Sequence, residues 1–192
     1  MTSPGETINL INGKIEFTAA RTDRAPMRVI GLAGWSGAGK TTLLRRLIPV
    51  LIAQGLRVST LKHAHHDFDV DQPGKDSWEH RQAGAQEVLV ASANRWALMH
   101  ELRGDAEPDL ADLLSRLSPV DLVLIEGFKR GGHPKLEVFR AANNKAPLYR
   151  DDPSVVAVAS DAPMPNLALP WLHLDDIPAI ATAVQVHAVQ VG

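Results

Sequence analysis

Residues 27–42 read MRVIGLAGWSGAGKTT, in which a glycine-rich segment follows a short apolar run. Residues 27–33 form a short, mostly apolar run, which predicts a buried strand. Residues 34–41 (GWSGAGKT) fit the pattern G-x-x-x-x-G-K-[ST] at every fixed position, and residues 42–54 follow with helical spacing of apolar side chains. A strand, a glycine-rich loop and a helix in this order are typical of a phosphate-binding P-loop, not of a chance glycine-rich turn.

The residue types of this loop suit a nucleotide triphosphate. Glycines let the backbone curl until several N–H groups converge on one anion, and the start of the helix adds its positive dipole end. Lys40 supplies a charge for the β and γ phosphates, and the Thr41 hydroxyl is placed to bind Mg²⁺. The predicted nucleotide-binding residues of the loop are Gly34, Trp35, Ser36, Gly37, Ala38, Gly39, Lys40, Thr41 and Thr42.

Composition sets the broad class of the protein. The chain has 192 residues, which suits one domain with a sizeable core, and we assign residues 27–192 to it. A net charge of −2 gives no reason to expect a basic face that binds nucleic acid. Because the chain has no cysteine, disulfides and thiolate metal sites are excluded. The sequence shows neither a signal-peptide pattern nor an apolar run of membrane-spanning length, so we expect a cytoplasmic protein without membrane contact.

Residues 1–26 precede the P-loop strand and are predicted to form an N-terminal arm or hairpin. Asn12-Gly13 separates two short β-prone runs within residues 8–17, which is a hairpin signal. A partly disordered arm is the alternative interpretation of these residues.

The rest of the chain alternates between strand and helix patterns. Residues 56–61 follow the P-loop helix as a second strand, and a crossover of this length makes the two strands parallel. We therefore predict an α/β protein: a three-layer P-loop NTPase fold with a mainly parallel sheet, helices on both faces and a β-ribbon extension. The other predicted strands are 86–91, 95–99, 120–125, 136–140, 155–159 and 171–174, and the other predicted helices are 78–84, 108–117 and one opened by Asp175-Asp176.

Residues 62–75 (KHAHHDFDVDQPGK) gather histidines and carboxylates just after a predicted strand. One interpretation is a transition-metal site, because imidazole and carboxylate are suitable ligands. A second is a loop that contacts nucleotide or substrate, and a third is a solvated loop without a ligand. The place of the loop favours the second, since ligands of open α/β sheets gather at the carboxyl ends of strands.

Two acidic residues that follow strands are candidates for magnesium and base recognition. Glu126 closes the apolar strand 120–125, as the carboxylate of a Walker B element does, and could bind Mg²⁺ or orient an attacking water. Asp121 lies at the wrong end of that strand. Asp161 follows strand 155–159, where its carboxylate could accept hydrogen bonds from N1 and N2 of guanine. The alternative for each of Glu126 and Asp161 is an ordinary turn residue. Residues 144–147 (NKAP) lack the aspartate of a guanine-binding motif, so we assign them no such role.

Several of these segments together resemble one known family. The P-loop, the histidine-rich run and the Glu-Gly-Phe-Lys turn resemble the molybdopterin-guanine dinucleotide biosynthesis protein B family, MobB, over roughly residues 27–161. The segments that carry the resemblance are 34–42, 62–77, 81–92 and 126–140. The resemblance implies a P-loop protein that binds GTP, hydrolyses it weakly and assists the guanylyltransferase that joins GMP to the molybdenum cofactor. It also implies a homodimer with a sheet extended between subunits.

The resemblance also implies roles for residues at matching positions. Residues 34–42 would bind the GTP phosphates, while Thr41 and Glu126 would serve Mg²⁺. Asp67 or Asp69 would help to bind the metal, and Asp161 would contact the base. Residues that could contact nucleotide or pterin phosphate are Lys62, Lys129 and the histidines His63, His65 and His66.

We therefore expect a GTP-binding adapter with weak GTPase activity, in which Lys40 and Glu126 act in catalysis and which delivers molybdopterin or GTP to a partner transferase. Slow hydrolysis fits the absence of an arginine finger that the sequence alone can place. A metallochaperone GTPase that binds nickel or zinc through His63, His65 and His66 is one alternative. The other is an ATP-dependent small-molecule kinase, whose basic lid would have to come from Arg130, Lys135 and Arg140.

Overall fold

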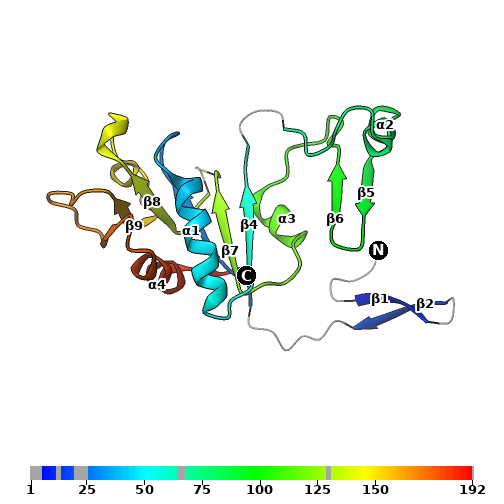
Figure 1. The fold of residues 1–192 in the computed structure, drawn as a ribbon, viewed down its shortest axis with the longest axis horizontal. Coiled ribbons are helices and arrows are strands. Elements are labelled where there is room, and N and C mark those ends of the chain that lie inside the picture. The colour runs from blue at the N-terminus through cyan, green and yellow to red at the C-terminus, as the bar shows by residue number, and fades with distance from the viewer. Residues whose placement is uncertain (1–5, 12–13, 20–25, 65–67, 129–130, 192) are drawn as a thin grey trace.

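The computed structural model describes residues 6–11, 14–19, 26–64, 68–128 and 131–191. Its centre is a seven-stranded sheet in the order β10-β9-β8-β3-β7-β4, with β11 paired to β3 (Figure 1). All strands are parallel except β11, which runs antiparallel to β3. The strands are β3 (Arg28–Ala33), β4 (Val58–Lys62), β7 (Leu122–Glu126), β8 (Lys135–Phe139), β9 (Val155–Ser160), β10 (Trp171–His173) and β11 (Val189–Gln190).

Helices cover both faces of this sheet, which confirms the predicted three-layer α/β fold. Helices α1 (Lys40–Ala53) and α4 (Ile177–His187) pack on one face, and α3 (Leu110–Ser115) packs on the other. Successive side chains of a strand point to opposite faces. Ile30 and Leu32 of β3 accordingly join the core under α1 and α4, while Val29 joins the smaller core with Leu114 of α3.

Helix α1 begins at Lys40, two residues before the predicted start. Gly39 takes the position before the helix with a φ of 99°, so the chain turns directly from the phosphate loop into the first helical turn. Leu47 and Leu51 are fully buried, as their spacing predicts, and Pro49 lies within the helix. Helix α4 begins where Asp176 accepts a hydrogen bond from the Ala179 N–H at 3.0 Å, a common N-cap.

Two hairpins accompany the sheet. Strands β1 (Glu6–Ile11) and β2 (Lys14–Ala19) pair antiparallel, so the predicted hairpin is present, although its turn at residues 12–13 lies outside the described residues. Strands β5 (Glu87–Ala91) and β6 (Trp96–His100) form a second antiparallel pair beside α2 (Asp76–Gln82). None of the described helices has the length and apolar character needed to cross a membrane.

The elements that the sequence did not predict are short. Strand β11 has two residues, too few for an alternating pattern, and it is placed by its pairing to β3. Two single-turn 3₁₀ helices, η1 (Ala141–Asn143) and η2 (Leu148–Arg150), lie in the segment between β8 and β9. This segment borders the candidate site.

Candidate functional site

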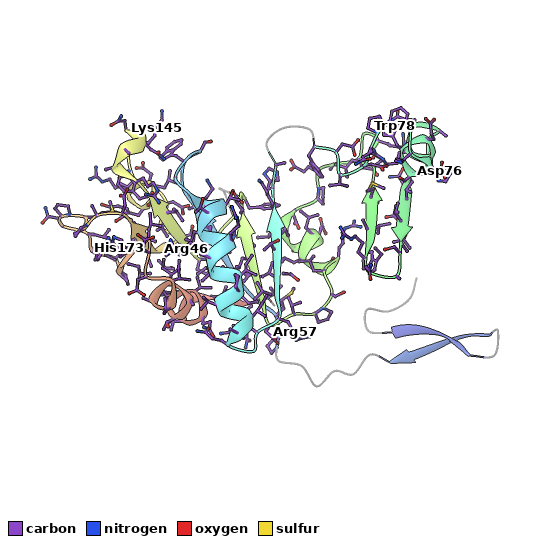
Figure 2. The ribbon with its side chains drawn as sticks, in the orientation of Figure 1. Arg46, Arg57, Asp76, Trp78, Lys145 and His173 are labelled. Carbon is purple, nitrogen blue, oxygen red and sulfur yellow. The ribbon has the colours of Figure 1, made fainter. Side chains whose placement is uncertain are left out.

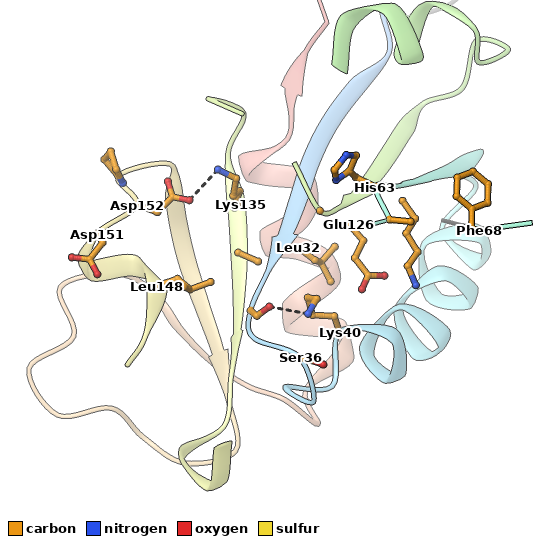
Figure 3. A pocket seen from close by; sticks show the side chains of 16 residues that line it. Leu32, Ser36, Lys40, His63, Phe68, Glu126, Lys135, Leu148, Asp151 and Asp152 are labelled. Atoms are coloured by element: carbon orange, nitrogen blue, oxygen red, sulfur yellow. Dashed lines mark hydrogen bonds and ion pairs between the residues drawn. The ribbon is translucent and has the colours of Figure 1, made fainter. Parts of the chain in front are cut away.

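A cavity of about 950 Å³ straddles the carboxyl ends of β3, β4 and β7 and the flank of β8. Three groups of residues surround it: the phosphate loop, the strand ends with the segment after β4, and a wall formed by η2 and the residues after it (Figure 3). The lining residues are Leu32, Ala33, Gly34, Ser36, Lys40, Lys62, His63, Ala64, Phe68, Glu126, Gly127, Lys135, Leu148, Asp151, Asp152 and Pro153. This is the place where ligands bind in open α/β sheets.

The phosphate loop owes its path to its glycines. Gly34 has a φ of 143°, and a Cβ atom there would lie 2.5 Å from the backbone oxygen of Val138, so the loop can pass β8 only without a side chain. The Lys40 ammonium donates to the carbonyl oxygens of Gly34 at 2.8 Å and Trp35 at 3.1 Å, which holds it over the loop. Thr41 is exposed in the first turn of α1.

A segment after β8 holds the outer side of the same loop. Arg140 Nε donates to the Ala38 carbonyl at 3.3 Å, and Asn143 Nδ2 donates to the Ser36 carbonyl at 3.4 Å. From the loop side, Trp35 Nε1 donates to the Ala146 carbonyl at 2.8 Å. We call residues 140–146 the clamp segment. These contacts cannot be predicted from the sequence, because partners more than 100 residues apart leave no local pattern.

Glu126 lies at the end of β7, beside the phosphate-loop strand. The strand register places it opposite Leu32 of β3 and Lys62 of β4, and both neighbours also line the cavity. The next residue, Gly127, has a φ of 101°, and a Cβ there would lie 2.6 Å from the Cβ of His63, so the two strand ends meet closely. Glu126 therefore faces the space that the phosphate loop borders.

Asp121 lies at the opposite end of β7, which agrees with its exclusion from the site. Its carboxylate forms an ion pair with Arg57 at 2.7 Å. Arg57 lies at the far end of the sheet from Lys145, which belongs to the clamp segment (Figure 2). The Arg57–Asp121 pair therefore links the amino ends of β4 and β7, away from the cavity, whereas Glu126 lines the cavity.

The histidine-rich segment is divided between the cavity and an ion-pair network. His63 lines the cavity and its Nε2 lies 2.5 Å from Glu107 Oε1. Asp69 does not line the cavity; its carboxylate binds Arg81, whose hydrogen bonds lower the pKa of Asp69. The predicted contacts His65, His66 and Asp67 lie outside the described residues, as do Lys129 and Arg130. Within the part of the chain that the structure describes, no group of three or more potential ligands could hold a metal ion.

The wall of the cavity rests on two buried charged residues of β8. Lys135 Nζ donates to Asp152 at 3.0 Å, Ser154 at 2.6 Å and the Gly131 carbonyl at 2.7 Å. Burial would raise the pKa of Asp152, but hydrogen bonds from Ser154 and Lys135 outweigh it and hold the pKa below its ordinary value. Lys135, at 2% exposure, is thus a fixed support of the wall. This counts against the lysine as part of a mobile kinase lid.

Glu137 of β8 also supports this wall. Its carboxylate is fully buried and accepts the backbone N–H groups of Leu148 at 2.6 Å and Tyr149 at 2.8 Å. Burial raises the pKa of Glu137 above its ordinary value, and the two N–H donors oppose that rise. The backbone of η2 is therefore attached to the sheet through a side chain.

Asp161 lies just beyond the end of β9 and outside the cavity lining. Its Oδ2 accepts from Arg140 Nη1 at 3.1 Å, so the guanidinium that touches the phosphate loop also touches this carboxylate. The structure thus joins Asp161 to the P-loop through one arginine.

Residues 29–161 match the family described as molybdopterin guanine dinucleotide synthesis protein B, MobB. The chain belongs to the MobB family. Over 159 residues it is 48% identical to the molybdopterin-guanine dinucleotide biosynthesis adapter protein of Escherichia coli (strain K12), covering 81% of this chain and 90% of that protein. It is 43% identical to the protein of the same name from Haemophilus influenzae, covering 82% of this chain and 87% of that one.

Solved structures of MobB proteins share the fold. One crystal structure of a molybdopterin-guanine biosynthesis protein B aligns with a TM-score of 0.66 and 27% identity, covering 82% of this chain and 98% of the other. Bacillus subtilis MobB aligns with a TM-score of 0.66 and 26% identity, covering 86% and 99% of the two chains. The family resemblance found in the sequence is therefore confirmed.

Proposed function

We propose that this MobB protein is a GTP-binding adapter in the synthesis of molybdopterin guanine dinucleotide. It binds GTP with Mg²⁺, hydrolyses it slowly and assists the guanylyltransferase that attaches GMP to molybdopterin. The observation that carries this proposal is a complete phosphate loop that borders a cavity at the carboxyl end of the sheet, in a chain of the MobB family. The adapter role is supported by the names of the E. coli and H. influenzae relatives.

The proposed phosphate site is formed by groups of the loop itself. The Lys40 ammonium donates to two carbonyl oxygens of the loop, and a triphosphate at the loop would place charged oxygens within its reach. The N–H groups of Gly37 and Gly39, both at positive φ, complete the anion site. Residues 34–42 are therefore the proposed contacts of the β and γ phosphates.

The donor set fits magnesium. A hydroxyl oxygen of Thr41 and a carboxylate of Glu126 are hard ligands, and Mg²⁺ prefers one or two such groups together with phosphate oxygens and water. When bound, the ion would offset the charge that develops on the phosphates. Asp69 stays a predicted helper, and in the described structure its carboxylate is engaged by Arg81.

Slow hydrolysis follows from the charges around the cavity. Among the described lining residues, the cations other than His63 are Lys40, Lys62 and Lys135, and no arginine faces the space. Glu126 can orient a water, but the charge stabilisation that an arginine supplies in fast GTPases would have to come from a partner. We therefore propose that the transferase, or a second copy of the chain, stimulates turnover.

A homodimer and a transferase complex are part of the proposal. Strands β5 and β6 carry exposed apolar side chains, with 62% of Leu89 and 64% of Trp96 accessible. Cross-strand pairing puts Leu89 opposite Leu98 and Ala91 opposite Trp96, so these side chains share one face of the hairpin. An apolar face of this kind is suited to burial against a second copy. The cytoplasm, which supplies GTP, is the proposed location.

Calorimetric titration with GTP and ATP in Mg²⁺ tests nucleotide binding. We expect tighter binding of GTP, and an Asp161→Ala variant should lose the preference while it keeps triphosphate binding. Equal affinity for GTP and ATP in the wild type would refute the proposed reading of guanine. Absence of triphosphate binding by the folded protein would refute the phosphate site itself.

Reconstitution with a molybdopterin guanylyltransferase tests the adapter role. Wild-type protein should raise the yield of molybdopterin guanine dinucleotide, and a Lys40→Ala variant should raise it less because GTP binding is weakened. An Arg116→Ala variant, which removes an exposed cation just after α3 and outside both the cavity and the clamp segment, serves as the control. Equal stimulation by wild type and both variants would show that the adapter effect does not depend on GTP.

A further inference from the structure

We propose that Arg140 is a positioning residue that joins the base-reading carboxylate of Asp161 to the phosphate loop. Recognition of guanine and affinity for phosphate would then depend on the same side chain. The part that concerns Asp161 rests on the proposed function, whereas the part that concerns the phosphate loop rests on the described contacts alone.

Arg140 reaches both partners from one position. It follows β8 directly, beside the phosphate-loop strand β3 in the sheet order. Its Nε donates to the Ala38 carbonyl at 3.3 Å, and its Nη1 donates to Asp161 Oδ2 at 3.1 Å. The guanidinium also lies close to the loop backbone, because a Cβ at Gly39 would be 3.4 Å from Arg140 Nε.

The hydrogen bond from Arg140 to the Ala38 carbonyl affects anion binding through the geometry of the peptide bond. A trans peptide points its C=O and the following N–H in opposite directions. A donor that holds the Ala38 carbonyl therefore turns the Gly39 N–H to the other side of the loop. Asn143 holds the Ser36 carbonyl at 3.4 Å, which does the same for the Gly37 N–H. The clamp segment thus orients the two N–H groups on which the anion site depends.

Arginine is the side chain that suits this double role. The guanidinium is planar, and its five N–H donors form a rigid fork, so fixing one donor fixes the direction of the others. The ammonium of lysine rotates freely and carries all its donors on one nitrogen atom. It would therefore keep the contact with Ala38 or the contact with Asp161, but not both. We therefore expect lysine to replace Arg140 only in part.

The ion pair between Arg140 and Asp161 would by itself contribute little free energy, because it is exposed. Arg140 and Asp161 are 39% and 37% exposed, and exposed pairs are typically worth about 0–1 kcal/mol. A nearby pair provides a matched control, since Arg46 binds Asp175 at 2.6 Å with a comparable exposure of 44%. Arg46 has no described bond to the phosphate loop, whereas Arg140 has one.

The test compares three probes in calorimetric titrations with Mg²⁺: inorganic tripolyphosphate, GTP, and ITP, whose base lacks the 2-amino group. We expect Arg140→Ala to lower tripolyphosphate affinity about tenfold, because the variant loses one hydrogen bond to the loop and the loop N–H groups lose the orientation that this bond gives them. The ratio of GTP to ITP affinity should fall to that of Asp161→Ala, and the double variant should fall no further. Arg140→Lys should lie between wild type and Arg140→Ala, and Arg46→Ala should match wild type.

The outcomes separate the two parts of the proposal. Unchanged tripolyphosphate affinity in a folded Arg140→Ala variant would overturn the part that concerns the phosphate loop. An unchanged ratio of GTP to ITP in that variant, with a reduced ratio in Asp161→Ala, would overturn the part that concerns Asp161. A wild type that binds GTP and ITP equally would overturn guanine reading by Asp161 in the proposed function, and with it the link to Arg140.

Discussion

Replacing Gly34 with alanine tests the close passage of the phosphate loop past β8. The added Cβ would lie 2.5 Å from the Val138 carbonyl oxygen, and backbone atoms cannot yield as a flexible side chain can. The φ of Gly34, 143°, also lies in a region that L-residues rarely adopt. Gly34→Ala therefore combines backbone strain with a steric clash.

The two costs can be separated with Gly55→Ala. Gly55 has a φ of 87°, but no atom lies within 4 Å of the place that a Cβ would take, so alanine there adds strain without a clash. Strain at a positive φ costs about 1–2 kcal/mol, and overpacking typically costs about 1–3 kcal/mol more. We expect a loss in the free energy of unfolding of about 1–2 kcal/mol for Gly55→Ala and about 2–5 kcal/mol for Gly34→Ala.

Chemical denaturation of the two variants and the wild type measures these losses. Titration with inorganic tripolyphosphate then shows whether the loop still binds an anion, which we expect for Gly55→Ala and not for Gly34→Ala. If Gly34→Ala lost no more stability than Gly55→Ala and still bound tripolyphosphate as wild type does, the described contact between the loop and β8 would be wrong.

Three further variants address separate features. Lys40→Ala should weaken GTP binding roughly 10–150-fold, the equivalent of about 1.5–3 kcal/mol for a charge-assisted bond, and unchanged affinity would contradict its phosphate role. Glu137→Ala should cost about 2–5 kcal/mol in denaturation, because two buried N–H groups lose their acceptor; a loss below about 1 kcal/mol would contradict this. Arg81→Ala should destabilise the protein at neutral pH. This effect should begin to fade below about pH 3.8, the ordinary pKa of an aspartate, and should fade further as the pH falls through the lowered pKa of Asp69 in the folded protein; an effect that stays constant over this range would contradict the Arg81–Asp69 pair.

Local patterns in the sequence predict the features that depend on neighbouring residues. The P-loop fits its motif at every fixed position, and the structure places its strand, loop and helix as expected. Glu126 is favoured over Asp121 by its place at the carboxyl end of a strand, and it lines the cavity. The positions of these residues can be predicted because strand direction and helix spacing follow from the pattern of consecutive residues.

Features that depend on distant residues cannot be predicted in this way. In the sequence, Lys135 stands just before a short predicted strand, where it could belong to a mobile lid. In the fold it is buried at 2% exposure, because the chain comes back to β8 after η2 and places Asp152 and Ser154 against its ammonium. The contact of Arg140 with Ala38 likewise spans 102 positions of the chain. Neither partner pair has a spacing that marks it in the sequence.

The position of Arg140 also bears on why hydrolysis should be slow. A guanidinium that holds the Ala38 carbonyl lies on the outer side of the loop, opposite the N–H groups that would face the phosphates. It can shape the ground-state site there, but from that side it cannot place its charge on a γ phosphate during hydrolysis. The lysines that do line the cavity are point charges without the planar fork of arginine. Among the residues that the structure describes, no arginine lines the cavity, so we propose that an arginine that speeds turnover comes from a partner, and stimulation of hydrolysis by the transferase should survive in Arg140→Lys.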